Sequence, residues 1–178
     1  MIHITLKDGS VKEFEAGVSV IDVAKSLGAG LAKAACCGRI DGKVADLRTP
    51  ITEDCHLEIC TFDDEDGKKT FWHTSSHVMA QAVKRLYPQA KFAIGPAIKE
   101  GFYYDFDVDK PFTPEDIEKI EAEMKKIVKE NLKFTVYEKP RAEAIALMEE
   151  RGEKYKVEHI GDLDDDARIT FYQQGDYI

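Results

Sequence analysis

The chain has 178 residues, of which 43% are hydrophobic, so it can bury one sizeable core or two small ones. Charged residues make up 33% and the net charge is −9, which argues against a basic surface that grips nucleic acid non-specifically. No apolar run approaches the roughly 18 residues that a membrane-spanning helix needs, and the N-terminus lacks a signal-peptide pattern. We therefore expect a cytoplasmic protein with no membrane partner.

Four cysteines are present, at positions 36, 37, 55 and 60. Cys36 and Cys37 are sequence neighbours and poor disulfide partners, and no C-x-x-C spacing occurs. In a cytosolic chain such cysteines are reduced thiols, which behave as small buried hydrophobic residues. The sequence therefore argues against a cysteine-based zinc site.

The first sixty residues predict a small β-grasp, or ubiquitin-like, module. Residues 2–15 alternate in hydrophobicity around an Asp8-Gly9 turn, which is typical of a hairpin. Ser19 can cap a helix that Gly28 ends. Short strands are then predicted at Cys36–Ile40, Lys43–Ala45 and His56–Thr61, the first two joined by a second Asp-Gly turn.

Residues 63–70 carry no apolar side chain and are predicted to be a linker, which sets domains at 1–62 and 71–178. A helix follows to about Pro88, then extended structure over 92–108. Thr113 followed by proline and two acidic residues predicts a helix to about Leu132. A strand at 134–138, a helix over 141–151 and a strand near 168–174 complete an α+β pattern with an antiparallel sheet and packed helices.

Nucleotide-binding and serine-hydrolase signatures are missing. The chain contains no G-x-x-x-x-G-K-[ST], no G-x-G-x-x-G and no G-x-S-x-G motif. Gly28-Ala29-Gly30 lies at a helix end and is better explained as a C-cap. ATP chemistry within these 178 residues is therefore not expected.

His73 and His77 stand four residues apart in the predicted helix that follows the linker, so both imidazoles lie on one face and can converge on a metal, a water or a substrate. Two imidazoles do not complete a tetrahedral zinc site, which takes three or four protein ligands. The alternative is a polar stripe on a half-exposed helix. His3, His56 and His159 are isolated and predicted to be structural or exposed.

A pocket wall is predicted between Gly95 and Phe106, a segment that offers glycine backbone and tyrosine hydroxyls. Lys156 lies between Tyr155 and Val157, and taken alone it is most simply a surface lysine.

These residues together resemble a known family. The β-grasp module, then Trp72-His73-Thr74-Ser75-Ser76-His77-Val78-Met79-Ala80, then Gly95-Pro96 and Gly101-Phe102-Tyr103-Tyr104-Asp105-Phe106, resemble the N-terminal region of bacterial threonyl-tRNA synthetases over the whole chain. The resemblance implies a TGS domain followed by an editing domain that hydrolyses serine wrongly attached to threonine tRNA.

Residue by residue, the resemblance implies that His73, His77 and Lys156 are catalytic and that Gly95 and Tyr104 bind the substrate. It also makes the two histidines candidate zinc ligands. In the family, a C-x-x-x-H segment that supplies the other half of the cluster follows the strand matching Thr170–Ile178, and this sequence ends before it. The editing site is therefore expected to be incomplete in this chain.

The resemblance further implies that the full-length protein uses ATP, magnesium and a zinc in its catalytic domain, and that it forms a homodimer through domains outside this sequence. No cofactor is expected to be required by the 178 residues themselves. Two alternatives stay open: a non-catalytic TGS-containing module that interacts with RNA, and a free-standing deacylase.

Overall fold

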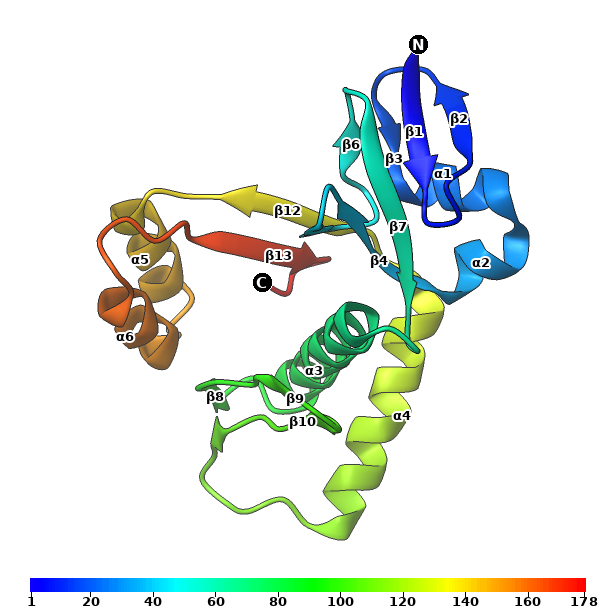
Figure 1. Ribbon diagram of the computed structural model, residues 1–178. Helices are drawn as coiled ribbons and strands as arrows, with labels where there is room; N and C mark the ends of the chain where they lie inside the picture. The colour runs from blue at the N-terminus through cyan, green and yellow to red at the C-terminus, as the bar shows by residue number, and fades with distance from the viewer. The chain divides into compact units, whose positions relative to one another are not determined.

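The computed structural model describes residues 1–178, and the chain divides into two compact units. The first comprises residues 1–74 and 97–101, and the second comprises residues 75–96 and 102–178. Figure 1 shows the helices and strands of both.

A five-stranded sheet in the order β2-β1-β7-β4-β5 forms the first unit. Strand β1 pairs in parallel with β7, and every other pairing in this sheet is antiparallel. The predicted hairpin and short strands are confirmed, and with them the β-grasp arrangement. The strands are β1 (Ile2–Leu6), β2 (Val11–Phe14), β4 (Ala35–Ile40), β5 (Lys43–Ala45) and β7 (Cys55–Thr61), with β3 (Val18–Ser19) and β6 (Pro50–Ile51) paired beside them.

Helix α1 (Val20–Leu27) begins at Ser19 as predicted, because the Ser19 hydroxyl accepts a hydrogen bond from the backbone N–H of Asp22. Gly28 ends the helix, but a further short helix, α2 (Ala29–Ala34), follows at once and was not predicted. The apolar face of α1 packs into a core with the sheet, formed by Ile2, Ile4, Val20, Val23, Ile51, Cys55 and Leu57.

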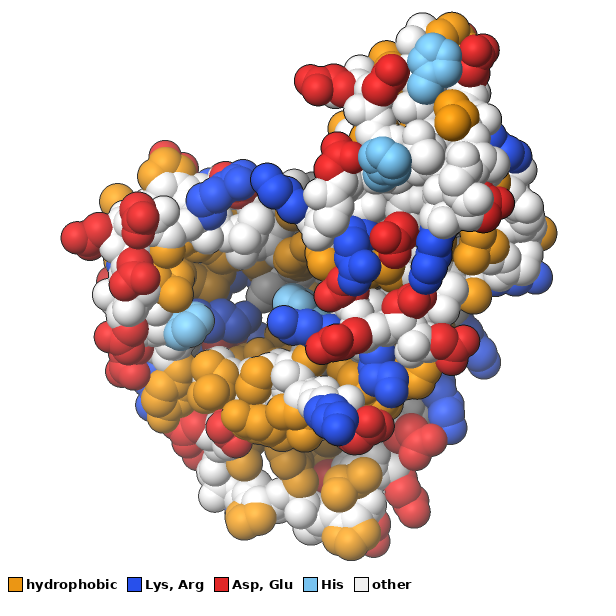
Figure 2. Space-filling view, in the orientation of Figure 1, with side chains coloured by type: hydrophobic (Ala, Val, Ile, Leu, Met, Phe, Trp, Pro, Cys, Tyr) orange, Lys and Arg blue, Asp and Glu red, His pale blue; other side chains and the backbone are white.

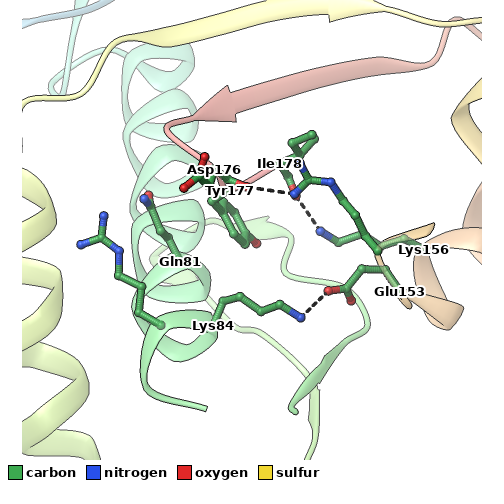
Figure 3. Close-up of a pocket in the computed structure, with 9 residues that line it drawn as sticks. Gln81, Lys84, Glu153, Lys156, Asp176, Tyr177 and Ile178 are labelled. Atoms are coloured by element: carbon green, nitrogen blue, oxygen red, sulfur yellow. Dashed lines mark hydrogen bonds and ion pairs between the residues drawn. The ribbon is translucent and has the colours of Figure 1, made fainter. Parts of the chain in front are cut away.

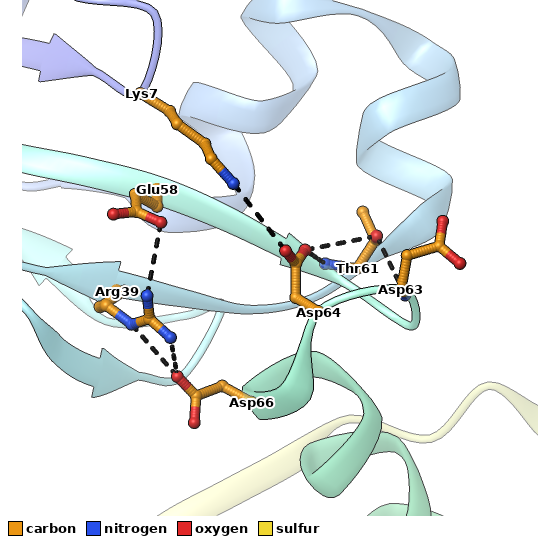
Figure 4. Close-up of polar contacts among 7 residues, drawn as sticks. All are labelled: Lys7, Arg39, Glu58, Thr61, Asp63, Asp64 and Asp66. Carbon is orange, nitrogen blue, oxygen red and sulfur yellow. Dashed lines mark hydrogen bonds and ion pairs between the residues drawn. The ribbon is translucent and has the colours of Figure 1, made fainter.

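The expected linker at 63–70 is mostly helical. Helix α3 (Glu65–Leu86) begins at Glu65, so the predicted helix starts six residues earlier than expected, and the compact units divide inside α3. The acidic side chains of this segment stabilise the start of the helix, because Glu65 and Asp66 lie in the first turn, where the helix dipole favours acids. Asp66 also pairs with Arg39 of β4, which in turn contacts Glu58 (Figure 4).

The close approach of α3 to the end of β7 requires a glycine. A Cβ on Gly67 would lie 1.8 Å from the carbonyl oxygen of Thr61. Asp64 fixes the same corner, since its carboxylate accepts from the Thr61 backbone N–H at 2.8 Å and lies 4.0 Å from Lys7 (Figure 4).

In the second unit, the C-terminal part of α3 packs against α4 (Pro114–Glu130) and the strand β8 (Lys91–Phe92). Helix α4 begins with the predicted cap at Thr113, where Asp116 completes a capping box, and ends at Asn131 in the left-handed conformation. Short strands occupy the region predicted to be extended: β9 (Ala97–Ile98) belongs to the first unit, β10 (Gly101–Phe102) begins in the first unit, and β11 (Phe106–Asp107) lies in the second. The core consists of Val78, Ala80, Ala82, Val83, Ala90, Phe92, Ile120 and Ile127.

Both predicted strands of the last third of the chain are present, and the structure pairs β12 (Phe134–Glu138) antiparallel with β13 (Thr170–Gln174). Between them lie α5 (Arg141–Glu150), which was predicted, and α6 (Lys154–Asp162), which was not. The side chain of Arg141 donates to the backbone oxygens of Ile160 and Leu163 at the end of α6. This long-range capping stabilises a helix whose own sequence carries a weak signal.

None of the helices is both long enough and apolar enough to cross a bilayer. On the face shown in Figure 2, acidic and basic side chains are interspersed over both units, which agrees with the sequence argument against a broad basic surface.

Candidate functional site

Helix α3 carries both predicted histidines, with His73 one turn before His77. The ring of His77 contacts two tyrosines of the C-terminal segment, with centroids 6.3 Å from Tyr172 and 6.2 Å from Tyr177. His73 lies in the part of α3 that belongs to the first unit. Its pKa is lowered by burial and by the nearby charge of Lys69. An imidazole held neutral in this way can accept a proton from water.

Gly95 and Tyr104, predicted to bind substrate, are in direct contact. A Cβ on Gly95 would lie 2.0 Å from the ring of Tyr104, so only glycine leaves room for this aromatic side chain. Tyr104 stacks on Phe106 with ring centroids 4.8 Å apart, and its hydroxyl is hydrogen-bonded to that of Tyr177. Burial raises the pKa of Tyr104, so it stays a neutral phenol.

Lys156 lies on α6 and is partly buried, so it is not an ordinary surface lysine. Its Nζ donates to the backbone oxygen of Ile178 at 2.8 Å and lies 5.2 Å from the ring centroid of Tyr177 and 5.8 Å from that of Phe92. Burial lowers the pKa of Lys156 to about 8. At neutral pH the side chain is therefore mostly an ammonium in a poorly solvated position.

Tyr177 joins the predicted residues of the second unit. Its ring contacts His77 and lies beneath Lys156, and its hydroxyl bonds to Tyr104, which lies against Gly95. The structure therefore brings four of the five predicted residues together around one tyrosine. Sequence reasoning missed Tyr177, because its contact with His77 joins residues one hundred positions apart and no local spacing reports such a contact.

A pocket of about 290 Å³ lies between α3, α6 and the C-terminal turn (Figure 3). We call it the Lys156 pocket. Four cations, two acids and three other residues line it: Lys84, Arg85, Arg151, Lys156, Glu153, Asp176, Gln81, Tyr177 and Ile178. Neither histidine is among its lining residues. Tyr177 therefore separates the imidazole of His77 from the ammonium side of the site.

Glu153 is the most deeply buried acid of this pocket, with 5% of its surface exposed. One carboxylate oxygen accepts a hydrogen bond from Lys84 Nζ at 2.7 Å, as Figure 3 shows. The other, Oε2, is buried and has no hydrogen-bond partner in the protein. Neither Glu153 nor Lys84 was singled out in the sequence.

The side chains present do not make a zinc centre. Across residues 1–178, no three His, Cys, Asp or Glu side chains gather in a way that would hold a metal ion. His73 and His77 supply two nitrogen ligands, short of the three or four that zinc takes. The cysteines lie in the first unit, where burial raises the pKa of Cys60 to about 12, so this thiol stays protonated rather than becoming the thiolate that zinc requires.

Comparison with known proteins shows what the chain is similar to. Residues 2–61 match the TGS domain. Over 178 residues the chain is 58% identical to the threonine–tRNA ligase of Acetivibrio thermocellus, and 59% identical to those of Clostridium tetani and Clostridium acetobutylicum. Each match covers 100% of this chain and 28% of the relative.

The chain thus spans little more than a quarter of the length of the curated relatives it matches. The match extends over both units, since no part of the chain is left out of it. The predicted resemblance is confirmed: along its whole length this chain is similar to the N-terminal part of threonine–tRNA ligases, beginning with a TGS domain.

Proposed function

We propose that this chain is the N-terminal part of a threonine–tRNA ligase and that its second unit carries a hydrolytic editing site, which removes serine wrongly attached to threonine tRNA. The observation that supports this best is the convergence of His77, Tyr104 and Lys156 on Tyr177. A base, a neutral phenol and a desolvated ammonium are the groups that hydrolysis of an ester uses.

The need for such a site follows from the size of serine. Serine differs from threonine by one methyl group, which gives a binding site only about 1–3 kcal/mol of discrimination, or roughly 10–200-fold. A second site that admits serine and excludes threonine by the same methyl group supplies the remaining accuracy. The partner of this unit is then threonine tRNA carrying serine.

The proposed reaction is addition of water to the ester carbonyl carbon. A neutral imidazole of the His73 and His77 pair takes the proton of the attacking water. The Lys156 ammonium stabilises the negative charge that develops on the substrate. The bond between the carbonyl carbon and the ribose oxygen then breaks, the ribose oxygen takes up a proton, and free serine and uncharged tRNA leave.

No step of this scheme runs through zinc; within residues 1–178 the two imidazoles of His73 and His77 would supply two of the three or four ligands that zinc takes. We assign contact with the tRNA to the TGS domain, and the ligation of threonine, with its ATP, to the rest of the full-length protein. That protein is expected to be cytoplasmic.

The test is accumulation of serine on threonine tRNA during aminoacylation by the full-length ligase supplied with serine. His77→Ala and Lys156→Ala are expected to accumulate seryl-tRNA while threonine ligation stays unchanged. His159→Ala, an exposed histidine on α6, is the matched control and is expected to behave like the parent. Variants that still bind tRNA and clear serine as the parent does would favour the alternative, a non-catalytic RNA-interaction module.

A further inference from the structure

A buried ion pair lies next to Lys156 and has no part in the proposed reaction. Lys84 of α3 and Glu153 at the start of α6 both line the Lys156 pocket, and their side chains are 2.7 Å apart. Glu153 is the residue immediately before α6 and Lys156 is the third residue of that helix, so the two are one turn apart.

The backbone holds Glu153 firmly in this position. Its N–H donates to the oxygen of Met148 at 2.9 Å, and its own carbonyl accepts from the N–H of Val157 at 3.1 Å. The preceding Gly152 has a φ of 69°, a left-handed turn that glycine adopts without strain. The chain therefore reverses sharply between α5 and α6 and inserts the Glu153 carboxylate into the interior.

The Glu153 side chain does not serve as a helix cap, because it makes no hydrogen bond to the first turn of α6. Its Oε1 is occupied by Lys84 and its Oε2 is buried without a partner. Leaving a buried carboxylate oxygen without a donor is costly, so a structural role alone explains the arrangement poorly. A carboxylate with one free oxygen beside a desolvated ammonium favours the positive charge of that ammonium.

We propose that Glu153 is a positioning residue whose buried carboxylate keeps the Lys156 ammonium charged across the pocket that both side chains line, with Lys84 fixing the orientation of the Glu153 carboxylate. This inference rests on the proposed editing function. Lys156 is the residue that would touch the substrate, and Glu153 and Lys84 act through it.

The charges around Lys156 are consistent with this role. Burial is the largest influence and lowers the pKa of Lys156, Glu153 raises it, and Lys84 and Arg151 lower it. Glu153 is the one group among these that favours the ammonium. The other charged or titratable groups that face the pocket or flank α6 are Arg85 of α3, Asp176 and Tyr177 of the C-terminal turn, and Lys91 of β8. In the 178-residue chain the α-carboxylate of Ile178 also faces it, with an oxygen 2.8 Å from Lys156 Nζ.

Opposite effects are expected from the two members of the pair. Glu153→Gln keeps the shape of the side chain but removes its charge, so Lys156 should lose its proton at lower pH, by about one pH unit. Lys84→Met removes a competing cation and frees Glu153 Oε1, so Lys156 should lose its proton at higher pH. A purely structural ion pair predicts no such difference in sign, because either change simply breaks it.

The first measurement is titration of Lys156 in the 178-residue chain, followed by NMR of the ¹³C-labelled lysine ε-carbons. Lys156→Arg identifies the signal, and Lys129→Met, an exposed lysine of α4, is the control. Shifts of the titration in opposite directions support the inference. Shifts in the same direction, or none, overturn it. If Glu153→Gln does not fold, Lys84→Met alone decides by the sign of its shift.

The second measurement is the pH dependence of seryl-tRNA hydrolysis by the full-length ligase. The upper limb of the profile should follow the NMR titration in each variant. When Lys156→Arg is the background, Glu153→Gln should no longer move that limb. NMR shifts of the expected sign with no hydrolysis by the parent would mean that the proposed function is wrong. Normal hydrolysis that depends on Lys156 but not on Glu153 would mean that this inference is wrong.

Discussion

The α-carbon of Gly95 and the ring of Tyr104 are so close that a single added methyl group would lie 2.0 Å from ring carbon Cδ2. Tyr104 in turn is hydrogen-bonded to Tyr177, which contacts His77 and Lys156. The absence of a side chain at Gly95 therefore allows Tyr104 to occupy the position from which it contacts Tyr177.

Gly95→Ala is expected to displace Tyr104 and cost about 1–3 kcal/mol of stability, as overpacking of a well-packed region does. Hydrolysis of seryl-tRNA should fall more than tRNA binding does, because the hydroxyl pair of Tyr104 and Tyr177 is lost. Chemical denaturation and a single-turnover assay measure the two effects. Gly161→Ala on α6, where an added Cβ meets open space, is the control and should lower neither.

A separate prediction concerns Gly67, near the start of α3. Replacing glycine by alanine inside a helix usually stabilises a protein by roughly 0.5–1 kcal/mol. At Gly67 the sign should reverse, because the new Cβ would lie 1.8 Å from the Thr61 carbonyl oxygen. A lower melting temperature is expected for Gly67→Ala, and an unchanged or higher one for Gly30→Ala in α2, where the space is open. Equal changes of melting temperature in the two variants would contradict the close approach of Gly67 to the Thr61 carbonyl oxygen.

Burial of the Lys156 ammonium should lower the free energy of unfolding of the chain. Its pKa falls from 10.5 to about 8 in the folded chain, so between these two values the unfolded chain binds more protons. Stability then rises with pH across that window, and the cost of burying the ammonium is fully present below about pH 8.

Lys156→Met removes this cost and is expected to raise the free energy of unfolding by about 2 kcal/mol at pH 7, after allowance for the lost bond to Ile178. The gain should shrink as the pH approaches 10.5, where the parent lysine is neutral in both states. Urea titrations at pH 7 and pH 10 test this, with Lys129→Met as an exposed control. A destabilised variant at pH 7 would mean that the hydrogen bond outweighs the burial.

Zinc should be held weakly. Since no third His, Cys, Asp or Glu joins His73 and His77, the remaining coordination positions fall to water, and affinity should be far below that of a structural site. Dialysis against a chelator followed by metal analysis is expected to leave no stoichiometric zinc on the 178-residue chain. Retention of one zinc per chain would show that other ligands complete a site.

Much of the fold was readable from local signals. The two Asp-Gly turns, the caps at Ser19 and Thr113 and the alternation in β1 act over a few residues, and the structure has each of them. Helix α6 was missed because distant groups, such as Arg141, cap it. The start of α3 was misplaced because charged residues suited to a linker also suit a helix N-terminus that carries an ion pair to β4.

The candidate site divides in the same way. His73 and His77 show a helical spacing, and Gly95 and Tyr104 lie in a segment with an evident pattern, so sequence reasoning reached them. Tyr177 and the pair of Lys84 with Glu153 depend on contacts between segments 69 or more residues apart. No periodicity encodes such contacts, and only the folded chain reveals them.

Single-turnover hydrolysis of seryl-tRNA and threonyl-tRNA by the full-length ligase, without ATP, tests the editing proposal most directly. The proposal predicts that the serine ester is cleaved faster than the threonine ester by at least about 10-fold, because the site excludes the extra methyl group. It also predicts that Lys156→Ala slows the serine reaction on the order of 10²–10³-fold, as removal of one charge-stabilising donor does. Equal rates for the two esters, or a serine reaction untouched by His77→Ala and Lys156→Ala, would contradict it.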